Sequence, residues 1–273
     1  MRGGNPPIGW VSAAARCRGT AHATRGEACE DALRVSVLGP DQSHLIAVVA
    51  DGAGSAARGG AGAALACRTL SSLAGAMLSQ NRLADLGIAD LRTVAITASD
   101  RMEAVAARHG LSARDLATTA LLALSDGTRS LILHVGDGAI VGRCGETGAW
   151  SALSWPAHGP YAGTTAFLTD EGEDGIRTLV DERPLDAVCL FSDGLERLVL
   201  DFASGEPHPP FFRMVAAPLD ALAADPEAAR GRNPRLSHAL RRYLESDGVA
   251  ERGDDDKTLV VAVRATSRLE GDP

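Results

Sequence analysis

The sequence predicts an α+β protein in which antiparallel strands form a sandwich and helices lie outside it. Strand-like runs come in two groups along the chain, with two helical stretches between the groups and further helical stretches near the end. A helix after every strand would be typical of a parallel sheet, and that alternation is absent here. With 273 residues, the chain is long enough to bury one large hydrophobic core or two small ones.

The strand-like runs are short, rich in Val, Ile and Leu, and bounded by Gly, Asp or Pro, which is the pattern of buried strands. The early group comprises residues 11–16, 33–38 and 45–50. The later group comprises residues 117–124, 131–135, 139–143, 176–180, 187–191 and 258–263.

Alanines and leucines at helical spacing predict two long helices between the strand groups, at roughly 60–78 and 91–108. Helical patterns return near 195–200, 211–222 and 234–244. Residues 201–210, "DFASGEPHPP", contain Pro and Gly and predict a loop.

Composition argues against several classes of protein. The net charge is −8 and no basic cluster is dense enough to indicate a nucleic-acid surface. No apolar run has the length of a bilayer span, and the first ten residues lack the apolar core of a signal peptide, so we expect no membrane partner. Five cysteines without a CxxC pair favour free thiols in a reducing cytoplasm over disulfides or a zinc site.

Three apolar runs end on an Asp-Gly pair, at Asp51, Asp137 and Asp193. The acidic pairs and triplets at 30–31 and 254–256 also adjoin predicted strands. A single Asp-Gly pair is usually just a turn former. If all five acidic groups meet at one place, however, their repulsion requires cations. Oxygen-only ligands favour Mg2+ or Mn2+ over zinc.

Six short motifs occur in a characteristic order between residues 19 and 261: "GTAHATRGEACEDA", "VVADGAGSA", "ATTALLAL", "HVGDGAIVGR", "FSDGLERL" and "DDDKTLVV". In this respect the sequence resembles the PP2C family of metal-dependent Ser/Thr protein phosphatases, especially its compact bacterial members. The resemblance implies a four-layer α/β/β/α sandwich of two antiparallel sheets flanked by helices. It also implies a single domain over 1–273. The helical pattern at roughly 205–245 is interpreted from the residues as an addition within that domain, which would either cover a sheet edge or meet a partner.

The resemblance further implies two Mn2+ or Mg2+ ions, with a weaker third. Asp51 would bridge two ions, the Gly52 carbonyl would complete one of them, and Asp193 and Asp255 would bind the other. These three aspartates form the implied catalytic set. The full implied metal set is Glu30, Asp31, Asp51, Gly52, Asp137, Asp193 and Asp255.

The activity implied by the resemblance is hydrolysis of phosphoserine or phosphothreonine in proteins by a water that the two ions share. The substrates would be phosphoproteins made by a Ser/Thr kinase. Two alternatives stay open: a phosphatase for small phosphoesters, and a regulatory module that binds phosphoproteins without turnover. The complete set of acids argues against the module, and a missing arginine argues weakly for it.

That arginine is the first of three departures from the family pattern. Many members carry it five residues before the aspartate equivalent to Asp31, where Gly26 stands here. Arg25 and His22 are therefore the candidates for binding the substrate phosphate. The fork of a guanidinium suits two phosphoryl oxygens.

The second departure is Ala53, which replaces a histidine that eukaryotic members often place after the Asp-Gly pair. The third is Arg197, which stands where an aspartate often helps to bind the third ion, with Glu196 beside it. Among other polar residues, we expect Thr118 and Thr119 to support the metal site and His134 to be a core histidine. The resemblance implies that His158 lies in the variable flap of the family, where we expect a loop role rather than substrate recognition.

Overall fold

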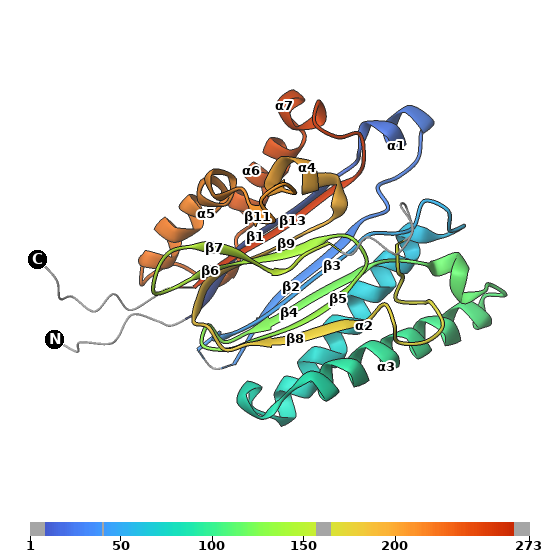
Figure 1. Cartoon of the computed structure of the whole chain (residues 1–273), viewed down its shortest axis with the longest axis horizontal. Coiled ribbons are helices and arrows are strands. Elements are labelled where there is room, and N and C mark those ends of the chain that lie inside the picture. The colour runs from blue at the N-terminus through green and yellow to red at the C-terminus, as the bar shows by residue number, and fades with distance from the viewer. Residues whose placement is uncertain (1–8, 40, 157–164, 265–273) are drawn as a thin grey trace, which may run out of the picture.

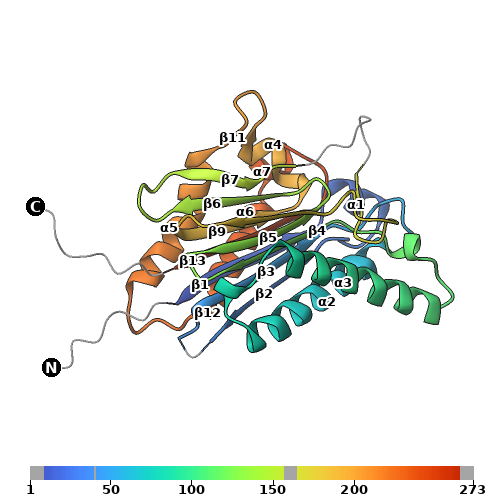
Figure 2. The same ribbon diagram turned by 60° about the horizontal axis from the view of Figure 1, so that its bottom comes forward.

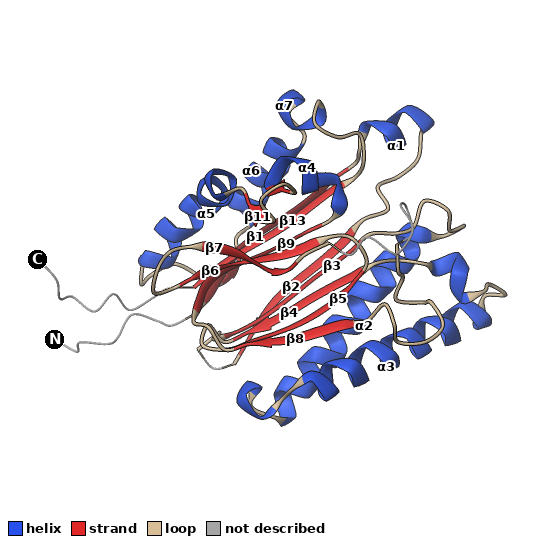
Figure 3. Cartoon of the chain, in the orientation of Figure 1, coloured by secondary structure: helices blue, strands red, loops and turns tan. Residues whose placement is uncertain are grey.

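The computed structural model describes residues 9–39, 41–156 and 165–264. Two sheets stack face to face, and helices cover the outer face of each sheet (Figure 1). Colouring by secondary structure shows the four layers directly (Figure 3). The predicted α/β/β/α sandwich is therefore confirmed.

The first sheet has the strand order β12-β1-β13-β9-β6-β7. All neighbours are antiparallel except for the short β12, which joins β1 in parallel. Its strands are β1 (Trp10–Cys17), β6 (Ala139–Cys144), β7 (Trp150–Ser154), β9 (Leu185–Phe191), β12 (Gly231–Arg232) and β13 (Lys257–Arg264).

The second sheet has the order β2-β3-β4-β5-β8 and is antiparallel throughout. Its strands are β2 (Ala32–Leu38), β3 (His44–Ala50), β4 (Ala120–Ser125), β5 (Ser130–Val135) and β8 (Arg177–Asp181). The predicted loop at 201–210 holds one side of a small hairpin, formed by β10 (Leu200–Asp201) and β11 (Glu206–Pro207).

Helices α2 (Gly59–Gln80) and α3 (Ile88–Arg108) cover the five-stranded sheet. Helices α5 (Pro209–Ala224) and α6 (Pro234–Leu244) cover the six-stranded sheet and lie within the segment 205–245, whose role the sequence left open. The described part of the chain also holds three short α-helices, α1 (Thr20–Arg25), α4 (Glu196–Val199) and α7 (Asp247–Ala250), and three 3-10 helices, η1 (Leu83–Asp85), η2 (Ala113–Leu116) and η3 (Asp193–Leu195).

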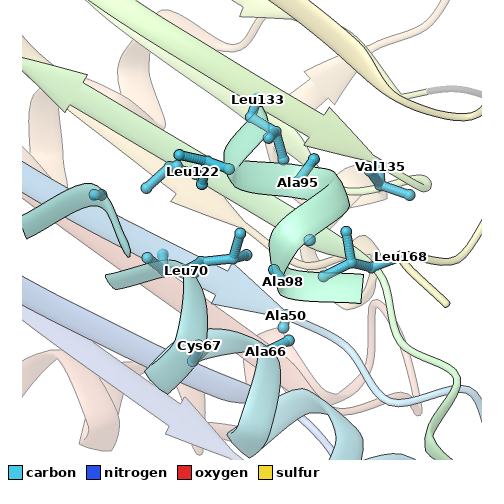
Figure 4. Close-up of a cluster of buried hydrophobic side chains, with 14 of the residues drawn as sticks. Ala50, Ala66, Cys67, Leu70, Ala95, Ala98, Leu122, Leu133, Val135 and Leu168 are labelled. Carbon is cyan, nitrogen blue, oxygen red and sulfur yellow. The ribbon is translucent and has the colours of Figure 1, made fainter. Parts of the chain in front are cut away.

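Three apolar layers hold the sandwich together, one between the sheets and one beneath each pair of helices. Figure 4 shows the layer under α2 and α3, where alanines such as Ala66 and Ala98 let the helices approach Leu122 and Leu133 of the sheet. Among helices of the described part, α2 alone is long and apolar enough to cross a membrane. Its apolar face packs on β2, β3 and α3, as expected of a core helix.

Three elements differ locally from those that the sequence predicted. The strand expected from residue 117 begins at Ala120, because Thr118 and Thr119 turn to bind the backbone of Asp51. Helix α1 is only six residues long, too short for a visible helical period. Strand β7, "WSALS", lacks the β-branched residues typical of strands.

Candidate metal centre

A cavity of about 330 Å³ opens at the α1 end of the sandwich, and carboxylates from separate segments line it. Asp51 follows β3, Asp137 lies between β5 and β6, Asp193 follows β9, and Asp255 precedes β13. The two sheets both contribute, so these acids meet at one end of the sandwich. Asp254 also borders this cavity, which we call the acidic cleft.

The backbone of Asp51 is held on both sides by the two threonines. Its N–H donates to Thr119 Oγ1 at 3.0 Å. Its carbonyl accepts from Thr118 Oγ1 and from the Thr119 N–H, both at 2.8 Å. The two threonines thus support the turn at Asp51, and these bonds fix where its carboxylate enters the cleft.

Gly52 is required because any larger residue would collide with the neighbouring backbone. Its own backbone conformation is one that other residues can adopt. A Cβ at this position would lie 2.2 Å from the carbonyl carbon of Gly59, at the start of α2. Real Cβ atoms do not approach backbone so closely. The Gly52 N–H donates to the Glu30 carbonyl at 3.3 Å, which joins this turn to the segment before β2.

Burial dominates the electrostatics of the carboxylates. Asp31 is fully buried, and burial raises its pKa to about 7, although Ser192 Oγ donates to its Oδ2 at 2.8 Å. Burial, followed by repulsion from Asp31 and Asp193, raises the pKa of Asp51 well above its ordinary value. Burial and the neighbouring Asp137 and Asp255 raise the pKa of Asp193 to about 6.

The donor set fits hard divalent cations. Asp31 Oδ1, Asp193 Oδ1 and Glu196 Oε1 are buried and have no hydrogen-bond partner within the described residues. Unpaired buried carboxylate oxygens are costly unless a cation compensates them. Within the described ranges, no group of three or more His, Cys, Asp or Glu side chains is already placed so that it could hold a metal ion. The fit to hard cations therefore rests on the oxygen chemistry of these unpaired carboxylates.

Asp256 is a site residue that the sequence reasoning missed. Its carboxylate accepts from the Gly19 N–H at 2.7 Å and from the Glu30 N–H at 2.6 Å, and His22 Nδ1 lies 3.0 Å away. Asp256 is 2% exposed, whereas Asp255 lines the cleft. The only signal in the sequence was the run of three aspartates, which does not say which one turns inward.

The structure places Glu30 and Asp31 beside the acidic cleft rather than on its lining. Asp31 lies behind Asp51, next to Ser192. Glu30 has an Oε2 atom 3.8 Å from His22 Nε2. Burial, opposed by the charge of His22, raises the pKa of Glu30.

Both candidate phosphate ligands belong to α1 and line the cleft. Burial lowers the pKa of His22, but the carboxylate of Asp256 outweighs it, so the pKa is raised overall. Arg25 is the last residue of α1, which Gly26 ends in the left-handed region (φ 73°). The Arg25 guanidinium is half exposed, and its Nε lies 2.5 Å from Glu27 Oε2.

The surroundings of Asp137 differ from the family pattern. Thr165 Oγ1 donates to Asp137 Oδ2 at 2.5 Å. Glu196 lies nearby: burial, then the charges of Asp193 and Asp137, raise its pKa to about 8. Arg197 is exposed at the surface. A carboxylate is thus present beside Asp137, but it comes from Glu196 rather than from position 197.

Two further histidines were named from the sequence, His134 and His158. His134 is a buried core residue, as expected, with Nδ1 2.7 Å from Ser154 Oγ and Nε2 2.9 Å from the Gly136 carbonyl. Burial lowers its pKa to about 3. His158, assigned above to the flap, lies outside the described residues.

Comparison with known proteins gives relatives along nearly the whole chain. The family profile of protein phosphatase 2C matches residues 18–245. The chain is 35% identical over 264 residues to serine/threonine-protein phosphatase 3 of Escherichia coli K12, covering 94% of this chain and all of that protein.

Solved structures show the same fold at low sequence identity. The catalytic domain of serine threonine protein phosphatase PstP, solved with two manganese ions, superposes with a TM-score of 0.63 at 18% identity, over 95% of this chain and 100% of that one. PppA of Pseudomonas aeruginosa, a regulatory component of its T6SS, gives a TM-score of 0.60 at 20% identity, over 94% and 98%. By sequence profile, curated relative and fold, the chain belongs to the protein phosphatase 2C family.

Proposed function

We propose that this protein is a Mn2+- or Mg2+-dependent protein phosphatase that hydrolyses phosphoserine and phosphothreonine. The observation that carries the proposal is the convergence of Asp51, Asp137, Asp193 and Asp255 in one cleft, with buried carboxylate oxygens that lack partners among the described residues. Such a set is costly in an apo protein and is compensated by divalent cations. Family membership supports the same reaction class.

The position of each residue in the acidic cleft suggests its role in the reaction. Asp51, with Asp193 and Asp255, would hold two ions, and Asp137 with Glu196 would hold a weaker third. When bound, the ions would supply an activated water and neutralise the phosphoryl oxygens. Arg25 and His22 border the same cleft and would orient the phosphate of the substrate. Ser192 is no nucleophile in this scheme, because its hydroxyl is committed to Asp31.

The proposed setting is the cytoplasm, with phosphoproteins made by a Ser/Thr kinase as substrates. All five cysteines are free, which suits a reducing compartment. The relative from E. coli is named a serine/threonine-protein phosphatase, which supports a protein substrate.

The test is turnover of a phosphoserine peptide and of p-nitrophenyl phosphate, with Mn2+ and with excess EDTA. We expect peptide turnover with Mn2+, none in EDTA, and loss of turnover in Asp193→Asn. Asp100→Asn, an exposed substitution on α3, is the matched control and should behave as wild type. Turnover in EDTA would refute the metal mechanism. Turnover of the small ester alone would favour a small-phosphoester phosphatase, and peptide binding without turnover would favour a regulatory module.

A further inference from the structure

A second cavity, of about 790 Å³, lies away from the acidic cleft, along the edge where β1 and β2 meet. Figure 2 shows these two strands side by side. Residues of α2 and α6 form its walls. Its floor is made of small side chains, Ala14, Ala32 and Ala64, which leaves room for an occupant. We call this cavity the arginine groove.

The groove concentrates positive charge in a chain of net charge −8. Its lining includes the five arginines Arg16, Arg34, Arg68, Arg232 and Arg241. Within the described residues, no Asp or Glu lines it. One acid stands near the rim: Glu245 pairs with Arg241 at 2.8 Å. The local surface is therefore cationic although the protein as a whole is anionic.

The arginines fall into two kinds. Arg16 donates to the Asp31 carbonyl, and Arg232 donates to the Ala14 carbonyl at 2.7 Å, so both are fixed to the backbone. Arg34 on β2 and Arg68 on α2 are exposed and make no hydrogen bond or ion pair within the part of the chain that the structure describes. These two guanidinium groups can bind an external anion without losing an internal partner.

We propose that the arginine groove is a docking site for an acidic segment of a protein substrate, separate from the cleft that binds the phosphorylated residue. Guanidinium forks pair bidentately with carboxylates, and an extended acidic segment can engage several of them in succession. The choice of a polypeptide rests on the phosphoprotein phosphatase function proposed above. A nucleic acid fits less well, because among the described residues no Phe, Tyr or Trp lines the groove to stack on bases, and His238 is the single ring there.

The arginine groove is also linked to the candidate metal centre by a hydrogen bond to the backbone. Arg16 binds the carbonyl of Asp31, whose carboxylate lies next to Asp51 and Ser192. Arg16 of the groove is thus bonded to the same segment of chain that positions the buried acids.

The test is binding of a fluorescein-labelled peptide of about ten residues, rich in glutamate and free of phosphate, measured by anisotropy. Because the probe needs no turnover, its result is independent of catalysis. We expect the reversal Arg34→Glu/Arg68→Glu to weaken binding by about tenfold or more, since two attractive contacts become repulsive. Salt should weaken binding by wild type, because the contacts are exposed.

The matched control is Arg101→Glu/Arg108→Glu on α3, which changes the net charge equally on an exposed surface outside the groove. It should bind the peptide nearly as wild type does. Both variants should keep their circular dichroism spectrum and their Mn2+-dependent turnover of p-nitrophenyl phosphate. The milder Arg34→Gln/Arg68→Gln, which should bind several-fold more weakly, replaces the reversal if the latter misfolds.

Three results would overturn the proposal. The first is equal peptide affinity in wild type and in the groove variants. The second is an equal loss in the α3 control, which would indicate a long-range charge effect rather than a groove. The third is tighter binding of a single-stranded oligonucleotide of the same charge, which would indicate a nucleic-acid site.

Discussion

At the scale of single residues, Asp256 joins three segments at the border of the acidic cleft. It accepts from the N–H groups of Gly19 and Glu30 and faces His22. Backbone hydrogen bonds to a carboxylate favour its charged form, and despite burial they help to lower the pKa of Asp256. One buried acid thus fixes α1, with its two candidate phosphate ligands, beside the metal-binding acids.

The ion pair between Arg25 and Glu27 bears on how the substrate phosphate is bound. Arg25→Ala should raise KM for a phosphopeptide by roughly fivefold to tenfold with a smaller fall in kcat, because an exposed charge-assisted contact is partly screened by solvent. Glu27→Gln should lower KM, since it frees the guanidinium that Glu27 Oε2 holds at 2.5 Å. Steady-state kinetics of the variants with saturating Mn2+ measure both effects.

His22→Ala is the matched comparison for Arg25, since both side chains line the cleft from α1. Arg25→Lys should recover part of the loss, because lysine keeps the charge without the fork. An unchanged KM in Arg25→Ala, together with a raised KM in His22→Ala, would assign the phosphate contact to the histidine.

At the scale of elements, the contact between the Asp51–Gly52 turn and the start of α2 positions the cleft. Gly52→Ala should destabilise the protein by about 1–3 kcal/mol, because its Cβ would meet backbone atoms of Gly59 and Gly60 that cannot easily move. Urea denaturation measures the change.

Gly54→Ala is the control two residues away. A Cβ at Gly54 meets nothing within 4 Å, so its stability should stay within about 0.5 kcal/mol of wild type. Equal stability of the two variants would show that α2 shifts freely at its start and that the close approach is not a constraint.

At the scale of the whole molecule, the buried acids make the free energy of unfolding depend on pH and on bound metal. Burial raises the pKa of Asp193, Asp31 and Glu196 to about 6, 7 and 8, and that of Asp51 in the same direction. The unfolded chain loses these protons nearer pH 4, so between about pH 4 and pH 8 the folded state binds more protons. The free energy of unfolding of the metal-free protein therefore falls as pH rises through this window.

We accordingly predict that Tm in EDTA falls between about pH 5 and pH 8, and that Mn2+ raises Tm more at pH 8 than at pH 5, since cations bind the deprotonated carboxylates. Asp51→Asn should flatten the decline, whereas Asp100→Asn should not. Thermal unfolding across this pH range measures both. A metal-free Tm that rises with pH in wild type would contradict the linkage.

Local chemistry determined most of the elements of this protein. Apolar runs of Val, Ile and Leu predicted nine of the strands, the alanine-rich periods predicted α2 and α3, and the patterns near 211–222 and 234–244 predicted α5 and α6. These signals are readable because they depend on neighbours within a few residues. The Asp-Gly ends of three apolar runs indicated Asp51, Asp137 and Asp193, and the family motifs added the four layers and the choice of Asp255.

Tertiary structure alone decided what lies next to what. Asp256, rather than its neighbours, turns inward because Gly19 and Glu30, more than two hundred residues earlier, offer it N–H donors. Arginines spread along β1, β2, α2, β12 and α6 form one groove only because those elements pack together at the sheet edge. Burial, and with it the raised pKa values of the acids, depends on contacts distant in sequence, which no local pattern encodes.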